Sequence, residues 1–568
     1  MNKNALKKFI AVSCAAILIA AALFGCTKID NTDTTEAAEA TQTSAGATSK
    51  LSDIIDESDM FSDRDLDPSY DESEASTITL KDGGSSSDSE NVTIDGDTVT
   101  ITAEGIYVVK GSLSNGQIVV EATDEKAKVQ LVFDGVEINC DTSAAVYVKQ
   151  ADKVFITLAD GSKNTLSNTS DFVQTDDNNV NAVIYSRDDL TLNGSGALTV
   201  NAKYGHAISS KDDLKLCGGT YEINADEKNG LDANDSIRIT SSTISVTSAN
   251  DALHAENDED ENAGFIYIKD GELTINAADD AIHGTSAILI KDGTVDIQSS
   301  NEGIEARMIE VQGGDVSVVA SDDGFNASSG NSATSDAQQM PQQQDTTELQ
   351  TEEVSQGATP PEPPSGDMPS GEMPSGEAPS DDTTQGGMPG GGMNGGMMDS
   401  DSNCYLYITG GNITVDAGGD GLDSNGYISI EGGYTVVYGA ENAGNGALDS
   451  GVSITVSGGT VIALGMSGMA EGFDESSTQG AILCNSVSGN KGDTVTLTDS
   501  SGKELISVEA VRSFDSVAVS TPDIAEGSTY TITAGSTSAQ IEMTSIVYSD
   551  SQGGMPGGMG GGRQGFGG

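Results

Sequence analysis

Short stretches in which apolar and polar residues alternate follow one another along most of the chain from about Ser76 onward. Residues 98–102 (TVTIT) and 494–497 (TVTL) are two of these stretches. Alternation with a period of two predicts β-strands that are buried on one face. Glycine, asparagine and aspartate separate the stretches, which is typical of turns between strands. The pattern therefore predicts an all-β protein.

From about residue 180 the alternating stretches recur as a repeat. Each unit has a four-residue corner, an alternating run, a turn containing glycine and a second alternating run, and one copy occupies residues 280–297. The apolar third residue of the corner aligns the copies at Ile208, Leu231, Leu253, Ile282, Ile304, Phe325, Leu422 and Leu448. Successive copies are most often 21 to 23 residues apart.

A repeat of this length, with two strands and two turns, is too small to bury its own apolar face, and stacked copies bury it as coils of a solenoid. Leucine-rich repeats share the period, but their leucine ladder is missing here and glycine recurs in each unit. We therefore predict a right-handed, single-stranded parallel β-helix with coils about 4.8 Å apart. The repeat stops after residue 486, and alternating strands beyond it predict a small C-terminal β cap.

Changes in composition divide the rest of the chain. The predicted parts are a lipoprotein signal peptide (1–25), a disordered acidic spacer (26–75), the first part of the β-helix (76–327), a disordered insertion rich in Gln, Pro, Gly and Met (328–402), the last coils (403–486), the β cap (487–548) and a Gly/Met-rich tail (549–568). The insertion and the tail have the low complexity that is typical of segments without a packed core.

The amino terminus has the pattern of an export signal. Lys3, Lys7 and Lys8 precede an uncharged apolar run that is short for a membrane span. The run ends in LFGC, which resembles the lipobox of bacterial lipoproteins and implies diacylglycerol attachment to Cys26. The alternative is an ordinary signal peptide with an accidental cysteine. The lipobox reading predicts an exported protein that is lipid-anchored on the outer face of the bacterial cell membrane.

The net charge of −63 excludes nucleic acid as a partner, because so acidic a surface repels phosphate. Nothing in the sequence indicates an oligomeric state. Outside the signal, the cysteines are far apart and form no CxxC motif, so they predict neither a zinc site nor a redox motif. Cys140, Cys217, Cys404 and Cys484 are interpreted as isolated core or turn residues, with disulfides as the alternative.

The repeated corner contains most of the candidate chemistry. Its third residue points inward, and the positions on either side form two polar columns along the stacked coils. The carboxylates in these columns are Asp232, Asp251, Asp280, Glu302, Glu305, Asp323, Asp420, Asp423 and Asp449. Neighbouring carboxylates one coil apart repel by about 3 kcal/mol at an effective dielectric constant near 20. A calcium ion with oxygen ligands would offset that repulsion, so we predict calcium as a cofactor.

Two features of the corner leave alternatives open. Aspartate and asparagine also satisfy the backbone amides of turns, which would need no metal. His206, His254 and His283, the three histidines of the chain, all lie in the corner. His254 and His283 on adjacent coils suit a transition metal, or they stack on each other and hydrogen-bond to neighbouring carboxylates.

No catalytic constellation stands out in the sequence. Lys269 and Lys291 each precede an Asp-Gly turn, where a lysine near calcium would suit a lyase base or simply be a turn residue. Tyrosines gather on the coils after the insertion and are candidates for stacking on sugar rings, with core or surface filling as the alternative. They are Tyr405, Tyr407, Tyr427, Tyr434 and Tyr438.

Several longer motifs agree in order with one known family. Residues 105–113 (GIYVVKGSL), 116–120 (GQIVV), 131–138 (LVFDGVEI), 156–164 (ITLADGSKN) and 468–479 resemble the clostridial carbohydrate-binding β-helix lipoproteins. The resemblance implies a calcium-binding parallel β-helix that binds plant cell-wall polysaccharides such as cellulose and pectin. It also implies coils similar to those of pectate lyases, in a family regarded as binding rather than cleaving.

Together these features predict a surface-anchored, calcium-binding protein that binds polysaccharide without catalysis. A calcium-dependent polysaccharide lyase of the pectate type is the alternative from the enzyme class. A structural adhesin or surface spacer is the further alternative.

Overall fold

The computed structural model describes residue 51 and residues 55–329 and 400–550. Its regular structure is almost entirely strand, accompanied by a 3-10 turn, η1 (Glu57–Asp59), and a short helix, α2 (Asp63–Leu66). The predicted signal peptide, Cys26, and nearly all of the predicted insertion and tail lie outside the described residues. No helix in the described part of the chain is long and apolar enough to cross a membrane.

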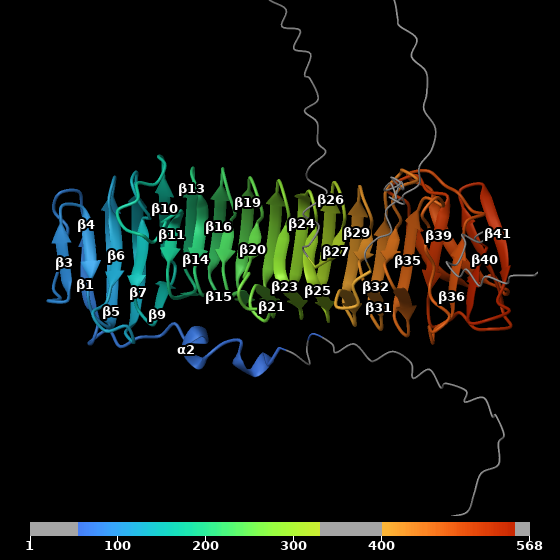
Figure 1. Ribbon diagram of the computed structural model, residues 1–568, viewed down its shortest axis with the longest axis horizontal. Helices are drawn as coiled ribbons and strands as arrows, with labels where there is room; N and C mark the ends of the chain where they lie inside the picture. Colours follow the sequence, from blue (N-terminus) through green and yellow to red (C-terminus); the bar gives the residue numbers. More distant parts are fainter. Residues whose placement is uncertain (1–50, 52–54, 330–399, 551–568) are drawn as a thin grey trace, which may run out of the picture. The chain divides into compact units, whose positions relative to one another are not determined.

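Each regular coil contributes to three parallel ladders (Figure 1). The corner ladder contains β8 (Val146–Gln150), β11 (Ala182–Ser186), β14 (His206–Ser210), β17 (Leu231–Ala233), β20 (Leu253–Ala255), β23 (Ile282–Ile290), β25 (Ile304–Val311), β27 (Phe325–Ala327), β30 (Leu422–Ser424) and β33 (Leu448–Ser450). The second ladder is called the arm-side ladder because residues 55–67, the arm described below, lie against it. It contains β9 (Lys153–Leu158), β12 (Asp189–Gly194), β15 (Asp213–Cys217), β18 (Ser236–Thr240), β21 (Phe265–Ile268), the second halves of β23 and β25, β28 (Tyr405–Ile408), β31 (Tyr427–Ile430) and β34 (Ser453–Val456). The third ladder contains β10 (Lys163–Asn168), β13 (Ala197–Ala202), β16 (Thr220–Ala225), β19 (Thr243–Ser248), β22 (Glu272–Ala277), β24 (Thr294–Ser300), β26 (Asp315–Ala320), β29 (Asn412–Ala417), β32 (Tyr434–Tyr438) and β35 (Thr460–Gly465).

The strand register matches the repeat that the sequence predicts. Along the corner ladder, Ile208 pairs in register with Leu231, and the same column continues through Leu253, Ile282, Ile304, Phe325, Leu422 and Leu448. The coils on either side of residues 330–399 pair directly, because β25 lies next to β28 and β27 next to β30. The prediction of an all-β parallel β-helix is thus confirmed.

The solenoid begins earlier than the repeat in the sequence. β1 (Ser76–Leu80) pairs in parallel with β5 (Gly105–Leu113), β5 pairs with β7 (Lys128–Asn139), and β4 (Thr98–Ile101) pairs with β6 (Gln117–Glu121). Antiparallel pairs formed by β2 (Ser86–Ser87) and β3 (Val92–Asp95) lie at this end. These first coils lack a regular period because their strands are long and carry register shifts.

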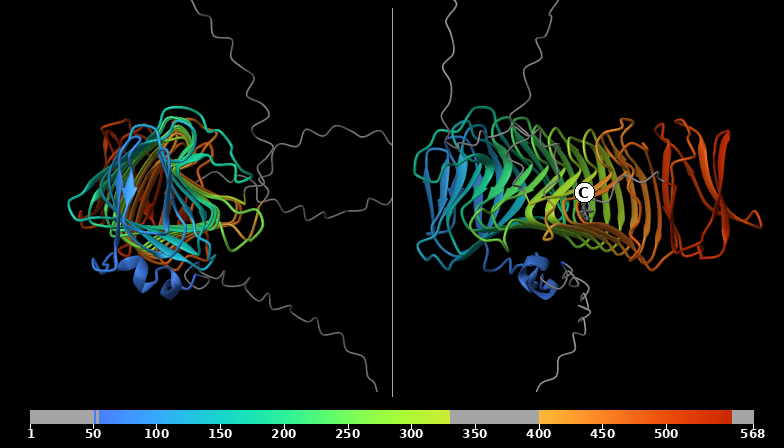
Figure 2. Two further views of the ribbon diagram at one scale, coloured as in Figure 1. Left: turned by 90° about the vertical axis from the view of Figure 1, so that its left-hand side faces the viewer. Right: turned by 45° about the vertical axis from the view of Figure 1, so that its right-hand side comes forward.

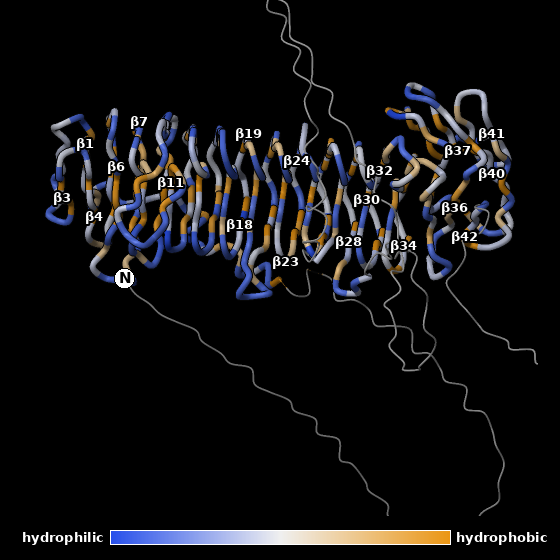
Figure 3. Tube along the Cα trace, turned by 45° about the horizontal axis from the view of Figure 1, so that its top comes forward, coloured by the Kyte–Doolittle hydropathy of each residue, from blue (hydrophilic) through white to orange (hydrophobic). Residues whose placement is uncertain are grey.

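Inward-facing aliphatic side chains from all three ladders fill the interior of the coils. The alternation along single strands is regular, as in β19, where buried and exposed residues alternate throughout. Figure 3 shows the same alternation as hydrophobic bands that recur from coil to coil. Since each coil contributes a few such side chains, neighbouring coils together bury an apolar core that a single coil does not have. Cys140, Cys217, Cys404 and Cys484 are buried and free of disulfides, as interpreted from the sequence.

The last coils are closed by antiparallel strands. β39 (Ser516–Ser520) pairs antiparallel with β35 and with β36 (Ala481–Cys484), while β42 (Val547–Ser549) pairs in parallel with β36. A separate antiparallel sheet contains β37 (Thr494–Asp499), β38 (Glu504–Glu509), β40 (Thr529–Ala534) and β41 (Thr537–Glu542). These strands bury a second apolar cluster, which forms the predicted cap (Figure 2).

The segment before β1 differs from the sequence prediction. Residues 55–67, here called the arm, contain η1 and α2 and contact the arm-side ladder through side chains. Asp65 in α2 is fully buried, and its carboxylate lies 2.7 Å from Nζ of Lys153 in β9. The prediction of a disordered spacer over residues 26–75 is therefore wrong for residues 55–75. The acidic composition predicted a solvated segment. Instead, cations that are far away in the sequence, such as Lys153, pair with the arm and order it.

Candidate cation site along one corner of the solenoid

The corner ladder places the polar corner residues in two columns. The first column contains His206, Asn229, Asp251, Asp280, Glu302, Asp323, Asp420 and Gly446, and the second contains Ser209, Asp232, His254, His283, Glu305, Asn326, Asp423 and Asp449. All nine predicted carboxylates therefore lie at one corner of the coils. Backbone N–H groups of one coil donate to carbonyls of the next, as from Ala252 to Asp280 at 3.0 Å, which fixes the spacing of the columns.

In each coil of the columns, the second residue of the corner, just before the inward-pointing residue, is glycine or alanine. A Cβ added to Gly303 would lie 2.2 Å from the carbonyl oxygen of Gly324 on the next coil, so this backbone approach requires glycine. Ala252 and Ala281 occupy the same place on other coils and are fully buried. The close approach holds the flanking carboxylates of successive coils against one another.

At the amino-terminal end of the columns, protein groups already balance the charge. Asp232 accepts hydrogen bonds from Ser209 at 2.8 Å and Asn229 at 3.2 Å, and it lies 3.2 Å from Nδ1 of His254. Lys211 is 3.9 Å away. Although burial opposes ionisation, these partners keep the pKa of Asp232 well below its usual range.

In the middle of the columns, two histidines stack between carboxylates. The rings of His254 and His283 are 5.2 Å apart between centroids and nearly parallel. Nδ1 of His283 lies 3.0 Å from Asp280 and 3.3 Å from Glu305. Burial opposes protonation, but these two carboxylates raise the pKa of His283 to about 11. The stacked, hydrogen-bonded interpretation of the two histidines is confirmed.

Carboxylate oxygens also crowd together in this middle region. Asp251, Asp279 and Asp280 offer ligand atoms within 4.8 Å of one another, and so do Asp280, His283 and Glu305. The first group is made of oxygen alone, which suits a hard cation such as calcium. The second is mixed and suits a softer ion. Asp279 was missed in the sequence because it stands just before the corner motif and is exposed.

Towards the carboxyl-terminal end, the carboxylates lack cationic partners among the described residues. The residues concerned are Glu302, Asp323, Asp420, Asp423, Asp449 and Glu471. Asp423 is 92% buried by area, and its Oδ1 receives no hydrogen bond from any residue that the structure describes. Burial and the carboxylate of Asp323 raise the pKa of Asp423 to about 8. A buried oxygen of this kind indicates a missing partner, either a proton or a cation.

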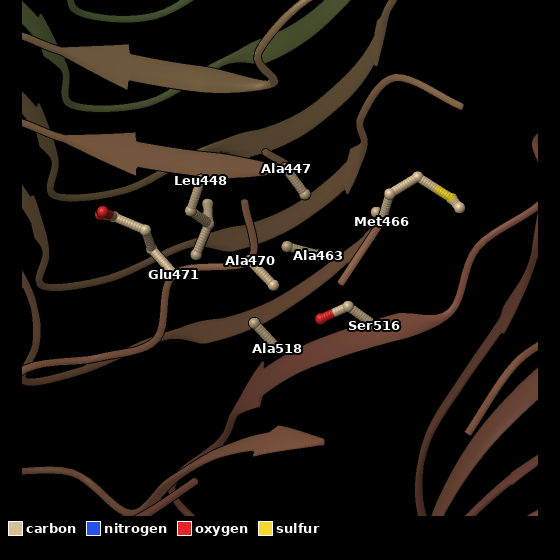
Figure 4. Close-up of a pocket in the computed structure, with 9 residues that line it drawn as sticks. Ala447, Leu448, Ala463, Met466, Ala470, Glu471, Ser516 and Ala518 are labelled. Carbon is tan, nitrogen blue, oxygen red and sulfur yellow. The ribbon is translucent and has the colours of Figure 1, made fainter. Parts of the chain in front are cut away.

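Glu471 extends the columns past the last corner motif. Its Oε2 accepts a hydrogen bond from the backbone of Ser450 at 3.2 Å, and burial together with Asp449 raises its pKa to about 7. Figure 4 shows its carboxylate directed away from the alanines of a small pocket, such as Ala463 and Ala518. It was missed as a candidate ligand because it lies outside the repeat, within the motif at 468–479.

The predicted tyrosines do not form one surface. Tyr405, Tyr407 and Tyr427 lie on β28 and β31 of the arm-side ladder, where Tyr405 and Tyr407 are buried and stacked with centroids 4.5 Å apart. Tyr434 and Tyr438 lie on β32 in the third ladder. Tyr434 is 38% exposed, whereas Tyr438 is buried and donates to the Glu509 carbonyl at 2.9 Å.

Neither predicted lyase lysine reaches the columns. Lys269 is exposed in the turn after β21, and Lys291 forms an ion pair with Glu57 of the arm. The lysine placed against a column carboxylate is Lys211, beside Asp232. The corner thus has the ligands of a cation site but no lysine poised next to its uncompensated carboxylates in the described residues.

Fold and corner together define a class of protein, a parallel β-helix with carboxylate columns along one corner. A family model described as carbohydrate-binding domain-containing protein matches residues 95–344. A carbohydrate-binding domain-containing protein of Acetivibrio thermocellus is 36% identical over 209 residues, which cover 36% of this chain and 72% of the relative. The chain therefore belongs to the carbohydrate-binding domain-containing family.

A solved structure is also similar in sequence to part of the chain. It is the gadolinium derivative of a polysaccharide lyase-like protein from C. thermocellum, with 33% identity and a TM-score of 0.35. The match covers 43% of this chain and 93% of that chain.

The raised pKa values predict how the stability of the metal-free protein depends on pH. Burial and neighbouring carboxylates raise the pKa of Glu302 to about 8 and that of Asp323 to about 7. Between the ordinary carboxyl pKa and these values, the folded state binds more protons than the unfolded state. Stability must therefore fall as pH rises from 5 to 8, by about 1.4 kcal/mol per pH unit for each extra proton held.

Thermal melts of the full chain in chelator, from pH 5 to 8, measure this slope. Glu302→Gln should flatten it, whereas Glu222→Gln, at an exposed position of β16, should leave it unchanged. A melting temperature that rises steadily over this range would contradict the electrostatic account of the columns.

Proposed function

We propose that the protein binds calcium along the corner columns and binds polysaccharide without cleaving it. The observation that carries the calcium proposal is the all-oxygen group of Asp251, Asp279 and Asp280, within 4.8 Å of one another. The unpartnered oxygen of Asp423 supports a further ion lower in the columns. The polysaccharide proposal rests on membership of the carbohydrate-binding family.

Bound calcium would offset the repulsion between neighbouring carboxylates of the columns. Each uncompensated carboxylate pair opposes folding, and the net charge of −63 adds to that repulsion. An ion that binds only the folded columns stabilises them by about 2.7 kcal/mol when its concentration is one hundred times its dissociation constant. Magnesium stabilises less, since it requires a tighter octahedron than a column of carboxylates offers.

Chelation should therefore lower the melting temperature of the full chain at neutral pH, and restored calcium should raise it. Asp280→Asn removes one ligand charge, so it should weaken the response to calcium more than it weakens the metal-free protein. Glu222→Gln removes an exposed charge elsewhere and should retain the full response. Identical melting curves in chelator and in millimolar calcium would mean that the column residues only satisfy the backbone amides of turns and bind no calcium.

The proposed ligands are cell-wall polysaccharides such as cellulose or pectin. Tyr434 is the most exposed of the five candidate tyrosines and offers a ring for stacking on sugar. A non-catalytic role fits the corner, because the described residues place no lysine or arginine against its uncompensated carboxylates. The family name supports binding and leaves the particular glycan to experiment.

The purified full chain should be retained on pectin or cellulose and should release no unsaturated uronides. Tyr434→Ala should reduce retention several-fold, while Val319→Ala, which removes an exposed apolar side chain from β26 of the same ladder, should not. Absorbance from unsaturated products would favour the lyase alternative. Absence of binding to every glycan tested would favour the structural adhesin.

We also propose export and lipid anchoring through Cys26, supported by the charged start, the apolar run and the LFGC motif. Extraction of the protein from cells should then require detergent. Cys26→Ser should release the protein into the medium or leave its signal uncleaved, while Cys140→Ser should change neither. Soluble, unacylated wild-type protein in the medium would contradict the anchor.

A further inference from the structure

The arm lies over a cluster of cations on a very acidic protein. The full chain has 26 Lys and Arg against 89 Asp and Glu. On the arm-side ladder, Lys153 of β9, Lys215 of β15 and Arg238 of β18 nevertheless line one hollow together with Asp65 of α2. Lys153 and Lys215 are each only 6% exposed. Cations buried to this degree require counter-charges.

Without the arm, the cations Lys153, Lys215 and Arg238 share two carboxylates on this face. The ladder itself supplies two carboxylates, Asp189 at 3.7 Å from Lys153 and Asp213 at 3.0 Å from Arg238. The third negative charge is Asp65 of the arm, 2.7 Å from Lys153 and 3.9 Å from Lys215. Further along the arm, Glu57 pairs with Lys291 and accepts a hydrogen bond from Tyr267.

Aromatic rings line the same face. Tyr267 lies 6.0 Å from Phe61 of the arm, and the ring of Phe155 lies 4.6 Å below the guanidinium of Arg64. Leu51 and Met60 pack over Tyr405, Tyr407 and their neighbours. Without the arm, the face would present rings next to cations, a combination that suits a sugar bearing a carboxylate.

The arm is held by side chains rather than as an added strand. Its backbone makes no ladder with the sheet in the described residues, and its contacts with the solenoid are ion pairs, apolar packing and a few hydrogen bonds such as that from Arg238 to the carbonyl of Met60. Such an attachment exchanges for another ligand without breaking a sheet. A neutral polymer would cover Lys153, Lys215 and Arg238 while leaving the three cations only two carboxylates, Asp189 and Asp213.

We propose that the arm is a displaceable, built-in occupant of a binding face for an acidic linear polysaccharide, whose carboxylates take the places of Asp65 and Glu57. This inference rests on the proposed polysaccharide binding, selects the acidic ligand among those proposed, and adds the binding face and a segment of the chain that competes for it. The overall negative charge does not forbid it, since repulsion from distant charges is screened beyond about 8 Å at physiological ionic strength.

Hydrogen exchange of the full-length wild-type chain tests the displacement. Addition of an oligogalacturonate should increase amide exchange in residues 55–67 several-fold and protect β12 and β15. A neutral cello-oligosaccharide of the same length should do neither. If oligogalacturonate binds while the arm stays protected, the inference is wrong but the proposed function stands.

Substitutions in the arm test the same competition from the other side. Weaker binding of the arm to the face must raise the affinity of the face for the polysaccharide. Asp65→Asn should increase the affinity for oligogalacturonate at least about tenfold, because a buried ion pair loses one partner. The matched control is Asp63→Asn, which removes an exposed acid of the same helix. Lys153→Gln combined with Lys215→Gln should abolish the gain.

If the wild-type chain binds no polysaccharide, a variant whose arm is released shows whether the arm was blocking the face. The variant for this purpose combines Glu57→Gln, Met60→Ala and Asp65→Asn, and hydrogen exchange verifies that its arm is free. Binding of oligogalacturonate by this variant supports the inference. Failure to bind, with the arm free and the solenoid still protected, overturns it and shows that the arm is a permanent cover.

Discussion

In-register stacking places each residue of a coil about 4.8 Å from its counterpart on the next, and this constraint produces both the core and the chemistry of the solenoid. The column from Ile208 to Leu448 is its apolar result. The carboxylates beside that column are its polar result. Because the repeat fixes which residues meet, a single charged position in the unit becomes a line of like charges.

The negative charge of the column carboxylates is balanced in different ways along the solenoid. Near Asp232, serine, asparagine, histidine and lysine balance the carboxylate. In the middle, Nδ1 of His283 lies between the carboxylates of Asp280 and Glu305. Further along, around Asp423, the described residues supply no cation, so protons at low pH or a bound ion must do so.

Sequence alone predicted what local periodicity determines. The register of eight corners, the two polar columns and the stacked histidines follow from a repeat that is visible in the letters. The first coils were included in the predicted solenoid through their alternating strands, although the long strands β5 and β7 carry no 22-residue period. Tyr427 and Tyr434 are close along the chain, but the successive strands β31 and β32 belong to different ladders of the solenoid.

The arm shows the limit of composition as a guide. Its acidic residues suggested a solvated spacer, yet Asp65 is buried against Thr191 and Lys153, which are far away in sequence. Nothing near Asp65 in the chain announces those partners. They become visible only when the coils stack and bring Lys153 and Lys215 to one face.

The central claim, that the carboxylate columns hold cations, is tested most directly by anomalous diffraction from crystals in which a lanthanide replaces calcium. The account predicts anomalous peaks bounded by the oxygens of Asp251, Asp279 and Asp280, with a further peak against Oδ1 of Asp423. Peaks confined to exposed acidic loops, with the column carboxylates hydrogen-bonded to one another, would contradict it.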